Sequence, residues 1–147
     1  MNLLSDVCDR RFPDAPRIHH ELLNRNQLSS AAAAARLRLL QWMCARASEP
    51  HLGMDTKRRP PEMSIYLSVL LNGGLHRAGP EGRWELGFSD EPYDKKHNRL
   101  LPSLKRICQD LIGRPDERVA VSHIYDALRS PPYGVRDGLL PVLLVAV

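Results

Sequence analysis

The last nine residues of the sequence, Leu139 to Val147, are all apolar, so a helix built from them has no polar face to turn toward water. Such a helix is stable only when other parts of a protein cover all of it. The cover can come from the preceding helices, from a partner, or from sequence beyond Val147. We therefore expect this segment to be buried, and its composition favours a fragment of a longer chain over a complete domain.

The rest of the composition is that of an ordinary globular protein. Of the 147 residues, 43% are hydrophobic and 26% are charged, which excludes disordered and collagen-like classes. The net charge of +4 is spread along the chain: residues 1–74 hold ten basic and seven acidic side chains, and residues 75–147 hold eleven and ten. Charge mixed in this way is typical of a solvated surface, and it does not by itself indicate a nucleic-acid binder.

The sequence also indicates the compartment. It has no run of about 18 apolar residues, so no membrane span is expected. The first residues are too short a stretch and too charged for a signal peptide. Cys8, Cys44 and Cys108 are odd in number and form no C-x-x-C, which fits free thiols in the cytoplasm. We expect Cys44 and Cys108 to be buried within helices.

Apolar periodicity and capping residues predict a mainly α fold with a small β-hairpin and a C-terminal helix-turn-helix or incomplete winged-helix-like unit. We treat residues 1–147 as a single helical domain or fragment, with an N-terminal helical half at 1–74 and a C-terminal helix-turn-helix-like part at 98–147. In the first half, helices are expected at 17–24, from a Ser29 or Ser30 cap through Ala47, and from Pro61 to a stop at Asn72-Gly73-Gly74.

Further along, turn residues predict a hairpin around Gly79 to Gly82 that pairs His76-Arg77 with Arg83 to Leu86. In the C-terminal part, we expect a helix from an Asn98 cap to Gly113, a strand at 118–121, a helix capped by Ser122, and a final helix capped by Asp137.

Motifs for catalysis are missing from the sequence. Neither a P-loop nor a G-x-G-x-x-G occurs, and His20-Glu21 begins an H-E-x-x-H in which Asn24 replaces the second ligand. The two adjacent histidines His19 and His20 are expected to be exposed or to cap a helix. No spacing gives a serine or cysteine a histidine base. We therefore predict no enzymatic activity and no metal, cofactor or small-molecule ligand.

Several phrases, in their order along the chain, resemble an internal segment of large bacterial P-loop ATPases of anti-phage defence systems, the BREX-type ATPases and their relatives. The phrases span nearly the whole sequence: Phe12-Pro13-x-x-Pro16, Glu21-Leu22-Leu23-Asn24-Arg25, Leu28-Ser29-Ser30-Ala31 with Ala35-Arg36, Leu52-Gly53, Pro61-Glu62-x-Ser64-Ile65-Tyr66, Gly74-Leu75-His76-Arg77, Pro131-Pro132-Tyr133-Gly134-Val135-Arg136-Asp137-Gly138 and Leu140-Pro141-Val142-Leu143-Leu144.

The resemblance implies a helical module outside the ATP-binding core, because no position matches a Walker motif. The expected role is a non-catalytic interaction module, or a truncated remnant, with other domains or subunits of the ATPase system as partners and DNA as a further candidate. A free-standing winged-helix DNA-binding regulator is the alternative, although Leu139 to Val147 offers no base-reading side chain.

Two sets of residues follow from the sequence as candidates for structural and binding roles. Pro131, Pro132, Tyr133 and Gly134 are expected to form a rigid turn that packs as a corner between helices. For contact with phosphate, the candidates are Arg114, Arg129, Arg136 and the basic run Lys57, Arg58 and Arg59.

Overall fold

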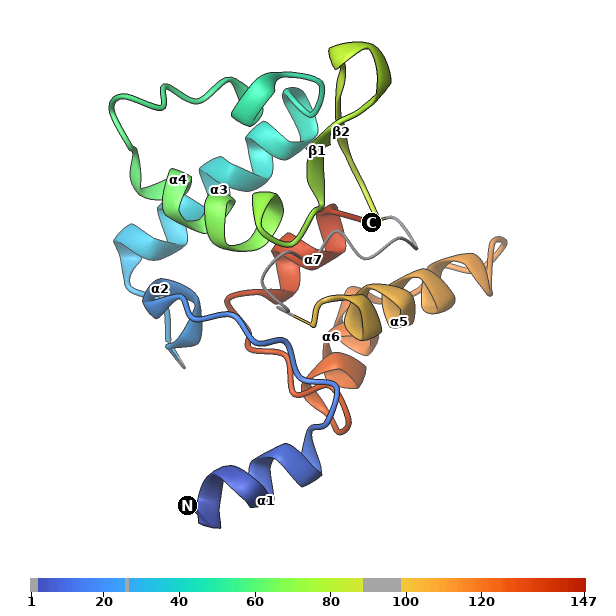
Figure 1. The fold of residues 1–147 in the computed structure, drawn as a ribbon. Coiled ribbons are helices and arrows are strands. Elements are labelled where there is room, and N and C mark those ends of the chain that lie inside the picture. Colours follow the sequence, from blue (N-terminus) through green and yellow to red (C-terminus); the bar gives the residue numbers. More distant parts are fainter. Residues whose placement is uncertain (1–2, 26, 89–98) are drawn as a thin grey trace.

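The computed structural model describes residues 3–25, 27–88 and 99–147. Within these ranges the chain is mainly helical, with one antiparallel hairpin, as the sequence predicts (Figure 1). The α-helices are α1 (Leu3–Arg11), α2 (Glu21–Asn24), α3 (Ser30–Ala45), α4 (Pro61–Ile65), α5 (Leu101–Ile112), α6 (Val121–Arg129) and α7 (Leu140–Val145). The shorter elements are the 3-10 turns η1 (Pro50–Gly53) and η3 (Pro80–Gly82), the π-helix η2 (Tyr66–Leu71), and the strands β1 (His76–Ala78) and β2 (Trp84–Leu86).

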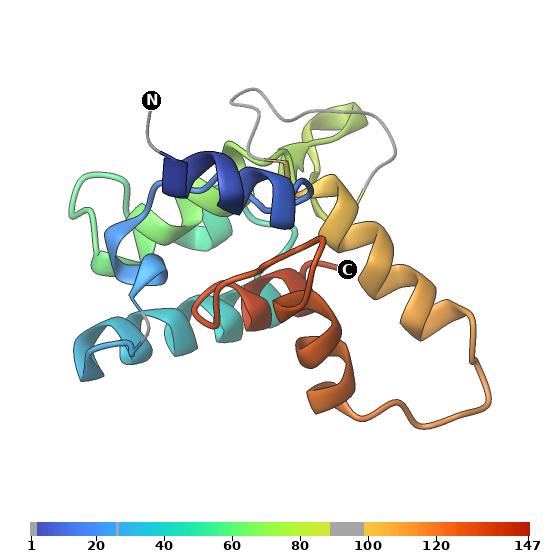
Figure 2. The ribbon, with the colours of Figure 1, turned by 90° about the horizontal axis from the view of Figure 1, so that it is seen from below.

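The apolar C-terminal helix α7 lies in the middle of the molecule, with α3 on one side and α5 on the other (Figure 2). Leu140, Val142 and Leu143 have no exposed surface. The predicted burial is therefore confirmed for most of this segment, while Pro141, Leu144 and Val145 are partly buried and Val147 is 40% exposed. Its cover comes from the helices that precede it. No described helix has both the length and the apolar character that a membrane crossing requires.

The long helix α3 forms where the alanine run and the serine cap predict it. The hydroxyl of Ser29 accepts a hydrogen bond from the amide of Ala32 at 3.2 Å, which satisfies one of the free amides in the first turn. Ala32, Ala35 and Leu39 are on the buried face, and α3 packs on α4 as well as on α7. Small alanine side chains on this face leave room for the neighbouring helices.

Helix α4 begins with Pro61, as predicted, and continues into η2 before the chain turns at Gly74 with φ 70°. The predicted hairpin follows, with His76 opposite Leu86 and Ala78 opposite Trp84. An ion pair between Arg38 of α3 and the buried carboxylate of Glu62 ties α4 to α3.

The N-terminal segment and the P-P-Y-G turn meet, although they are far apart in sequence. The amide of Asp14 donates to the carbonyl of Pro132 at 3.1 Å, and the Pro131–Pro132 peptide bond is cis. Gly134 has φ 57°, and a Cβ there would lie 2.6 Å from the ring of Phe12. The turn is thus a tightly packed corner, and glycine is needed both for its backbone conformation and for this approach.

Some local predictions are wrong at the boundaries. The predicted strand at 118–121 does not form, because Ala120 accepts from the amide of His123 and Val121 begins α6. Ser122 therefore lies inside α6 rather than capping it. Asp137 does not cap α7: its carboxylate accepts a hydrogen bond from Arg129, and Leu139 precedes the helix without a side-chain cap.

Two further predictions are corrected in the first half of the chain. The expected helix at 17–24 is reduced to α2, because His20 is extended (φ −134°) and the Asn24 side chain donates to the carbonyl of Ile18. Cys44 is exposed, because α3 directs the preceding residue, Met43, toward the core. Cys108 is half-buried. The predicted Asn98 cap lies outside the described residues.

Candidate functional site

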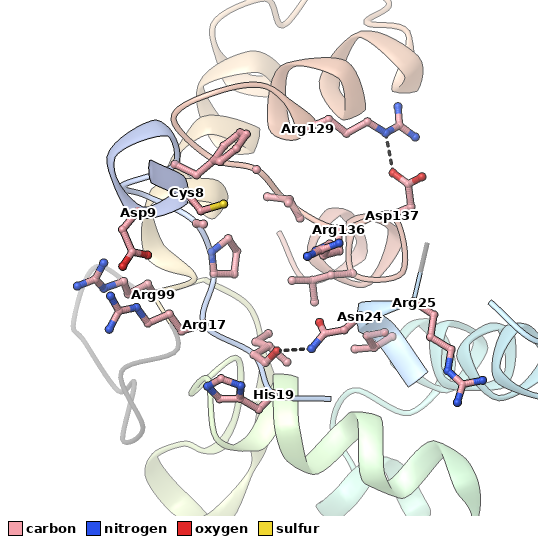
Figure 3. Close-up of a pocket in the computed structure, with 18 of the residues that line it drawn as sticks. Cys8, Asp9, Arg17, His19, Asn24, Arg25, Arg99, Arg129, Arg136 and Asp137 are labelled. Carbon is pink, nitrogen blue, oxygen red and sulfur yellow. Dashed lines mark hydrogen bonds and ion pairs between the residues drawn. The ribbon is translucent and has the colours of Figure 1, made fainter. Parts of the chain in front are cut away.

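A cleft of about 1040 Å³ opens between the N-terminal segment, α2 and the chain that follows α6 (Figure 3). We call it the arginine cleft. Its lining comes from α1, from the extended stretch after it, from α2 and from the P-P-Y-G region. The side chains that give it chemical character are five arginines, Arg17, Arg25, Arg99, Arg129 and Arg136, against two carboxylates, Asp9 and Asp137.

The floor of the cleft is apolar and fixed. Ile18, Leu23, Val135 and Leu139 line it, and each is at most 8% exposed because it also belongs to the core. Gly138 brings the two halves of this floor together: a Cβ there would lie 2.7 Å from the carbonyl oxygen of Leu23. The side chain of Asn24 donates to the carbonyl of Ile18 at 3.0 Å, which holds the extended stretch against α2.

The arginines lie around this floor. In the close-up, Arg17, Arg99 and Asp9 lie together on one side, and Arg129, Arg136 and Asp137 lie on the opposite side (Figure 3). Arg99 also donates to the carbonyl of Pro13 at 3.3 Å. Arginines placed on two sides of an apolar floor can bind anionic groups there through paired N–H donors.

Arg129 is held by two carboxylates. It donates to Asp137 at 2.6 Å and to Asp126 at 2.9 Å, and its guanidinium lies over the ring of Tyr125. The hydrogen bond to Asp137 raises the pKa of Arg129, with the charges of the two aspartates adding to the effect. Arg129 is therefore held at the edge of the cleft by two carboxylates that balance its charge.

Of the six basic residues that the sequence nominated for phosphate contact, the structure brings two, Arg129 and Arg136, to the cleft. Arg114 lies between α5 and α6 and pairs with Glu117 at 3.5 Å. The run Lys57, Arg58 and Arg59 is exposed in the loop before α4 and does not line the cleft.

Sequence reasoning did not find Arg17, Arg25 and Arg99 as members of the site. They follow no shared spacing and come from separate segments, so no local pattern marks them. The signal that does exist is indirect: Phe12-Pro13-x-x-Pro16 and the P-P-Y-G phrase both mark corners, and these corners meet at the cleft.

A serine and a histidine meet outside the cleft. The Nε2 atom of His20 lies 3.1 Å from the hydroxyl of Ser64, which itself donates to the carbonyl of Pro61 at 2.8 Å. Since the serine proton is used in that bond, His20 is the donor to the hydroxyl and is not placed as its base. Burial lowers the pKa of His20. The pair attaches the stretch before α2 to α4. His19 is exposed, as expected, whereas His20 is buried and occupies the N-cap position of α2 without a side-chain capping bond.

A second polar group is buried beneath the hairpin. Tyr66 and His76 have no exposed surface, and the tyrosine hydroxyl lies 2.8 Å from Nδ1 of His76. The Nε2 atom of His76 lies 2.9 Å from the carbonyl of Ala47, which can only accept, so Nε2 carries the proton and Tyr66 donates to Nδ1. Burial lowers the pKa of His76, the bond to Ala47 opposes this, and nearby His51 lowers it further. This network is a satisfied part of the core.

Over the described part of the chain, no three His, Cys, Asp or Glu side chains are grouped so as to hold a metal ion. No protein-family model matches the sequence, and neither curated proteins nor solved structures give a match. The chemistry of the arginine cleft is therefore the main structural guide to function.

Proposed function

We propose that this chain is a non-catalytic helical interaction module of the kind present in large anti-phage defence ATPases, and that it contacts its partner through the arginine cleft. The observation that carries the proposal is the convergence of the resembling phrases in space. Phe12 packs on Gly134 and the Leu23 backbone packs on Gly138; all four residues belong to those phrases, and Phe12, Leu23 and Gly134 line the cleft.

Other contacts between the phrases support the same proposal. Arg36, from the phrase that opens α3, donates to the carbonyls of Asp137 and Gly138 at 3.3 and 3.4 Å. The resembling residues are thus the ones that hold the N-terminal and C-terminal segments together around the cleft. Residues that fix the shape of a surface, without a nucleophile and base among them, suit a module that works by binding.

The alternative, a winged-helix DNA-binding regulator, needs an exposed recognition helix that enters the major groove. The helix in that position is α7, and its Leu140, Val142 and Leu143 are fully buried against α3 and α5. This burial favours the interaction module.

The test is a sedimentation-velocity titration of this chain with the ATP-binding core of a BREX-type ATPase that lacks the corresponding segment. We expect a complex that Arg136→Glu weakens by about tenfold or more, because the substitution reverses a charge in the cleft. The matched control is Arg114→Glu, an exposed arginine outside the cleft, which should leave the affinity unchanged. Absence of a complex, together with tight binding to duplex DNA that falls steeply with salt, would instead support the regulator.

A further inference from the structure

We propose that acidification separates the turn η1 from the β-hairpin, because four aromatic rings hold these parts together only while the two histidines among them are neutral. We call the rings the ring cluster, and the arrangement seen in the structure the closed state. The ring cluster consists of His51 of η1, Tyr66 of η2, His76 of β1 and Trp84 of β2. None of the four lines the arginine cleft, so the inference is independent of the proposed interaction function.

The four rings form a closed circuit of contacts. The imidazoles of His51 and His76 both pack on Trp84, with ring centroids 5.2 and 4.9 Å apart and planes tilted by 47° and 40°. Tyr66 completes the circuit edge-on, at 5.8 Å from His51 and 5.6 Å from His76. Each ring comes from a different element. The circuit therefore joins η1, η2 and both strands of the hairpin at one place.

The backbone of η1 is strained in the closed state. His51, Leu52 and Gly53 have φ values of 50°, 55° and 69°, so three successive residues are in the left-handed region. This conformation is unfavourable for residues with a side chain, and for leucine in particular. Such strain persists only where other contacts hold it. Here those contacts are the fully buried side chain of Leu52 and the ring contacts of His51, so weaker ring contacts favour movement of the turn.

A proton on His76 disrupts the hydrogen bonds at the centre of the ring cluster. In the neutral form Nε2 donates to the carbonyl of Ala47 at 2.9 Å, and Nδ1 accepts from the hydroxyl of Tyr66 at 2.8 Å. A charged imidazole carries a proton on both nitrogens, so Nδ1 can no longer accept. Because Tyr66 and His76 have no exposed surface, water cannot replace the lost acceptor in the closed state.

A proton on His51 is also unfavourable in the closed state. Its Nδ1 atom is buried and has no hydrogen-bond partner among the described residues. The two imidazoles also affect each other, since nearby His51 lowers the pKa of His76. The indole of Trp84 attracts one cation that packs on its face, but two charged imidazoles on the same indole repel each other. Charging both histidines therefore favours a state in which they are apart.

The charged groups described around the ring cluster come as neighbours of opposite sign. Arg46 and Glu49 approach the same point of η1. Arg77 and Glu85 lie 3.8 Å apart, and alternation along the strands puts them on the face of the hairpin away from the ring cluster. Acid therefore adds positive charge to surroundings in which the other described charges are balanced.

The parts that would separate are lightly packed. Figure 1 shows the hairpin at one edge of the molecule. His76 is the one buried residue of its two short strands, and the chain at 55–59, which follows η1, is exposed. Elements with few buried contacts open at a lower free energy than the whole fold. We therefore expect η1 and the hairpin to separate while α3 and α7 stay in place.

The experiment measures how accessible Trp84 is to acrylamide, a fluorescence quencher, in the full chain carrying Trp42→Phe. This variant has a single tryptophan, which is partly buried in the closed state. On acidification from pH about 7.5 to about 5.5, the quenching constant should rise about twofold or more as the open population grows. The midpoint should lie below pH about 6.5, because burial lowers the pKa of His76 in the closed state. Far-UV circular dichroism should stay unchanged.

Variants in the same background assign the response to the ring cluster. His51→Asn removes one imidazole, and asparagine tolerates the positive φ, so quenching should become independent of pH. The matched control is His123→Asn at an exposed site, and His20→Asn removes the other histidine whose pKa burial lowers. Both should keep the full response. Tyr66→Phe removes a donor that favours neutral His76, so the midpoint should move to higher pH.

Each other result overturns the inference. A quenching constant that does not rise with acid shows that the turn stays closed, and a rise accompanied by loss of helical ellipticity shows unfolding of the whole chain. A full response in His51→Asn, or its loss in His20→Asn or His123→Asn, places the cause outside the ring cluster. A midpoint in Tyr66→Phe that stays or falls contradicts the role of His76. Binding to the ATPase core at neutral pH is tested separately and stands or falls by itself.

Discussion

Helices α1 and α7 both carry leucines and valines, but the structure treats them in opposite ways. Helix α7 lies between α3 and α5 with Leu140, Val142 and Leu143 fully buried. Helix α1 has no buried residue, and its leucines are among the most exposed apolar side chains described. The same residue types therefore stabilise the fold at one position and form an open surface at the other.

The two helices differ in the neighbouring surfaces against which they pack. Helix α7 packs on α3, whose buried face includes the small residues Ala32 and Ala35. Helix α1 is joined to the rest of the molecule chiefly at its C-terminal end, where Phe12 packs against Gly134. Apolar composition alone does not decide burial, because a helix also needs a complementary neighbour.

The largest effect is expected from shortening a buried side chain of α7. Leu143→Ala removes a fully buried leucine and leaves a cavity, so the free energy of unfolding should fall by about 2–5 kcal/mol. Leu3→Ala on α1 makes the same change at an exposed site and should alter stability by less than about 0.5 kcal/mol. Urea denaturation of both variants measures the contrast. Similar losses in the two would mean that α1 is packed in solution.

The next effect concerns the contact between α2 and Gly138, which lies just before α7. Gly138→Ala places a Cβ against the backbone of Leu23, at 2.7 Å from its carbonyl oxygen, and backbone cannot move aside as a flexible side chain can. We expect a loss of about 1–3 kcal/mol in thermal or urea unfolding. The control is Gly82→Asn, because Gly82 has open space around it and asparagine tolerates its positive φ. A harmless Gly138→Ala would show that the segment before α7 does not approach the backbone of α2 this closely.

A comparable effect is expected at the buried hydroxyl of Tyr66. Tyr66→Phe leaves Nδ1 of His76 without its donor inside the core, which should cost about 1–3 kcal/mol at neutral pH. In the unaltered protein the folded-state pKa values of His76 and His20 are lowered by burial, so the unfolded chain takes up protons first as pH falls.

The sign of the pH dependence follows from this. The contribution of these two histidines to the free energy of unfolding is fully present above pH about 6.5, the ordinary pKa of histidine. It is lost as the pH falls through that value toward the folded-state pKa. Tyr66→Phe should reduce this loss, since the tyrosine donor favours the neutral imidazole. Urea titrations at several pH values between about 5 and 8 measure both effects, and a stability that rises toward low pH would contradict the assignment.

Much of the fold could be predicted because its signals are local. The Ser29 cap and the alanine run define α3, the proline pair starts α4, and glycines around the hairpin fix its turn. The errors fall where tertiary contacts override local preference. Asp137 has a good capping side chain, yet Arg129 takes it as an ion-pair partner, and the serine at 122 falls inside a helix that starts one residue earlier.

The arginine cleft could be predicted only in part. Arg129 and Arg136 flank a recognisable turn, so the sequence indicates them. Arg17 reaches the site through the path of the N-terminal segment over the P-P-Y-G corner, and Arg99 comes from the chain before α5 and donates to the carbonyl of Pro13. That path depends on contacts such as the hydrogen bond from Asp14 to Pro132, between residues more than a hundred positions apart. One sequence contains no local sign of such pairings.

The smallest effect on stability, and the one that most sharpens the contrast between the two helices, is expected for Val7→Ser combined with Leu4→Ser. Both side chains are largely exposed, so replacing them should change the free energy of unfolding by less than about 0.5 kcal/mol. Urea denaturation of this double variant beside Leu143→Ala measures the contrast. A loss of stability as large as that of Leu143→Ala would place α1 with α7 in the core.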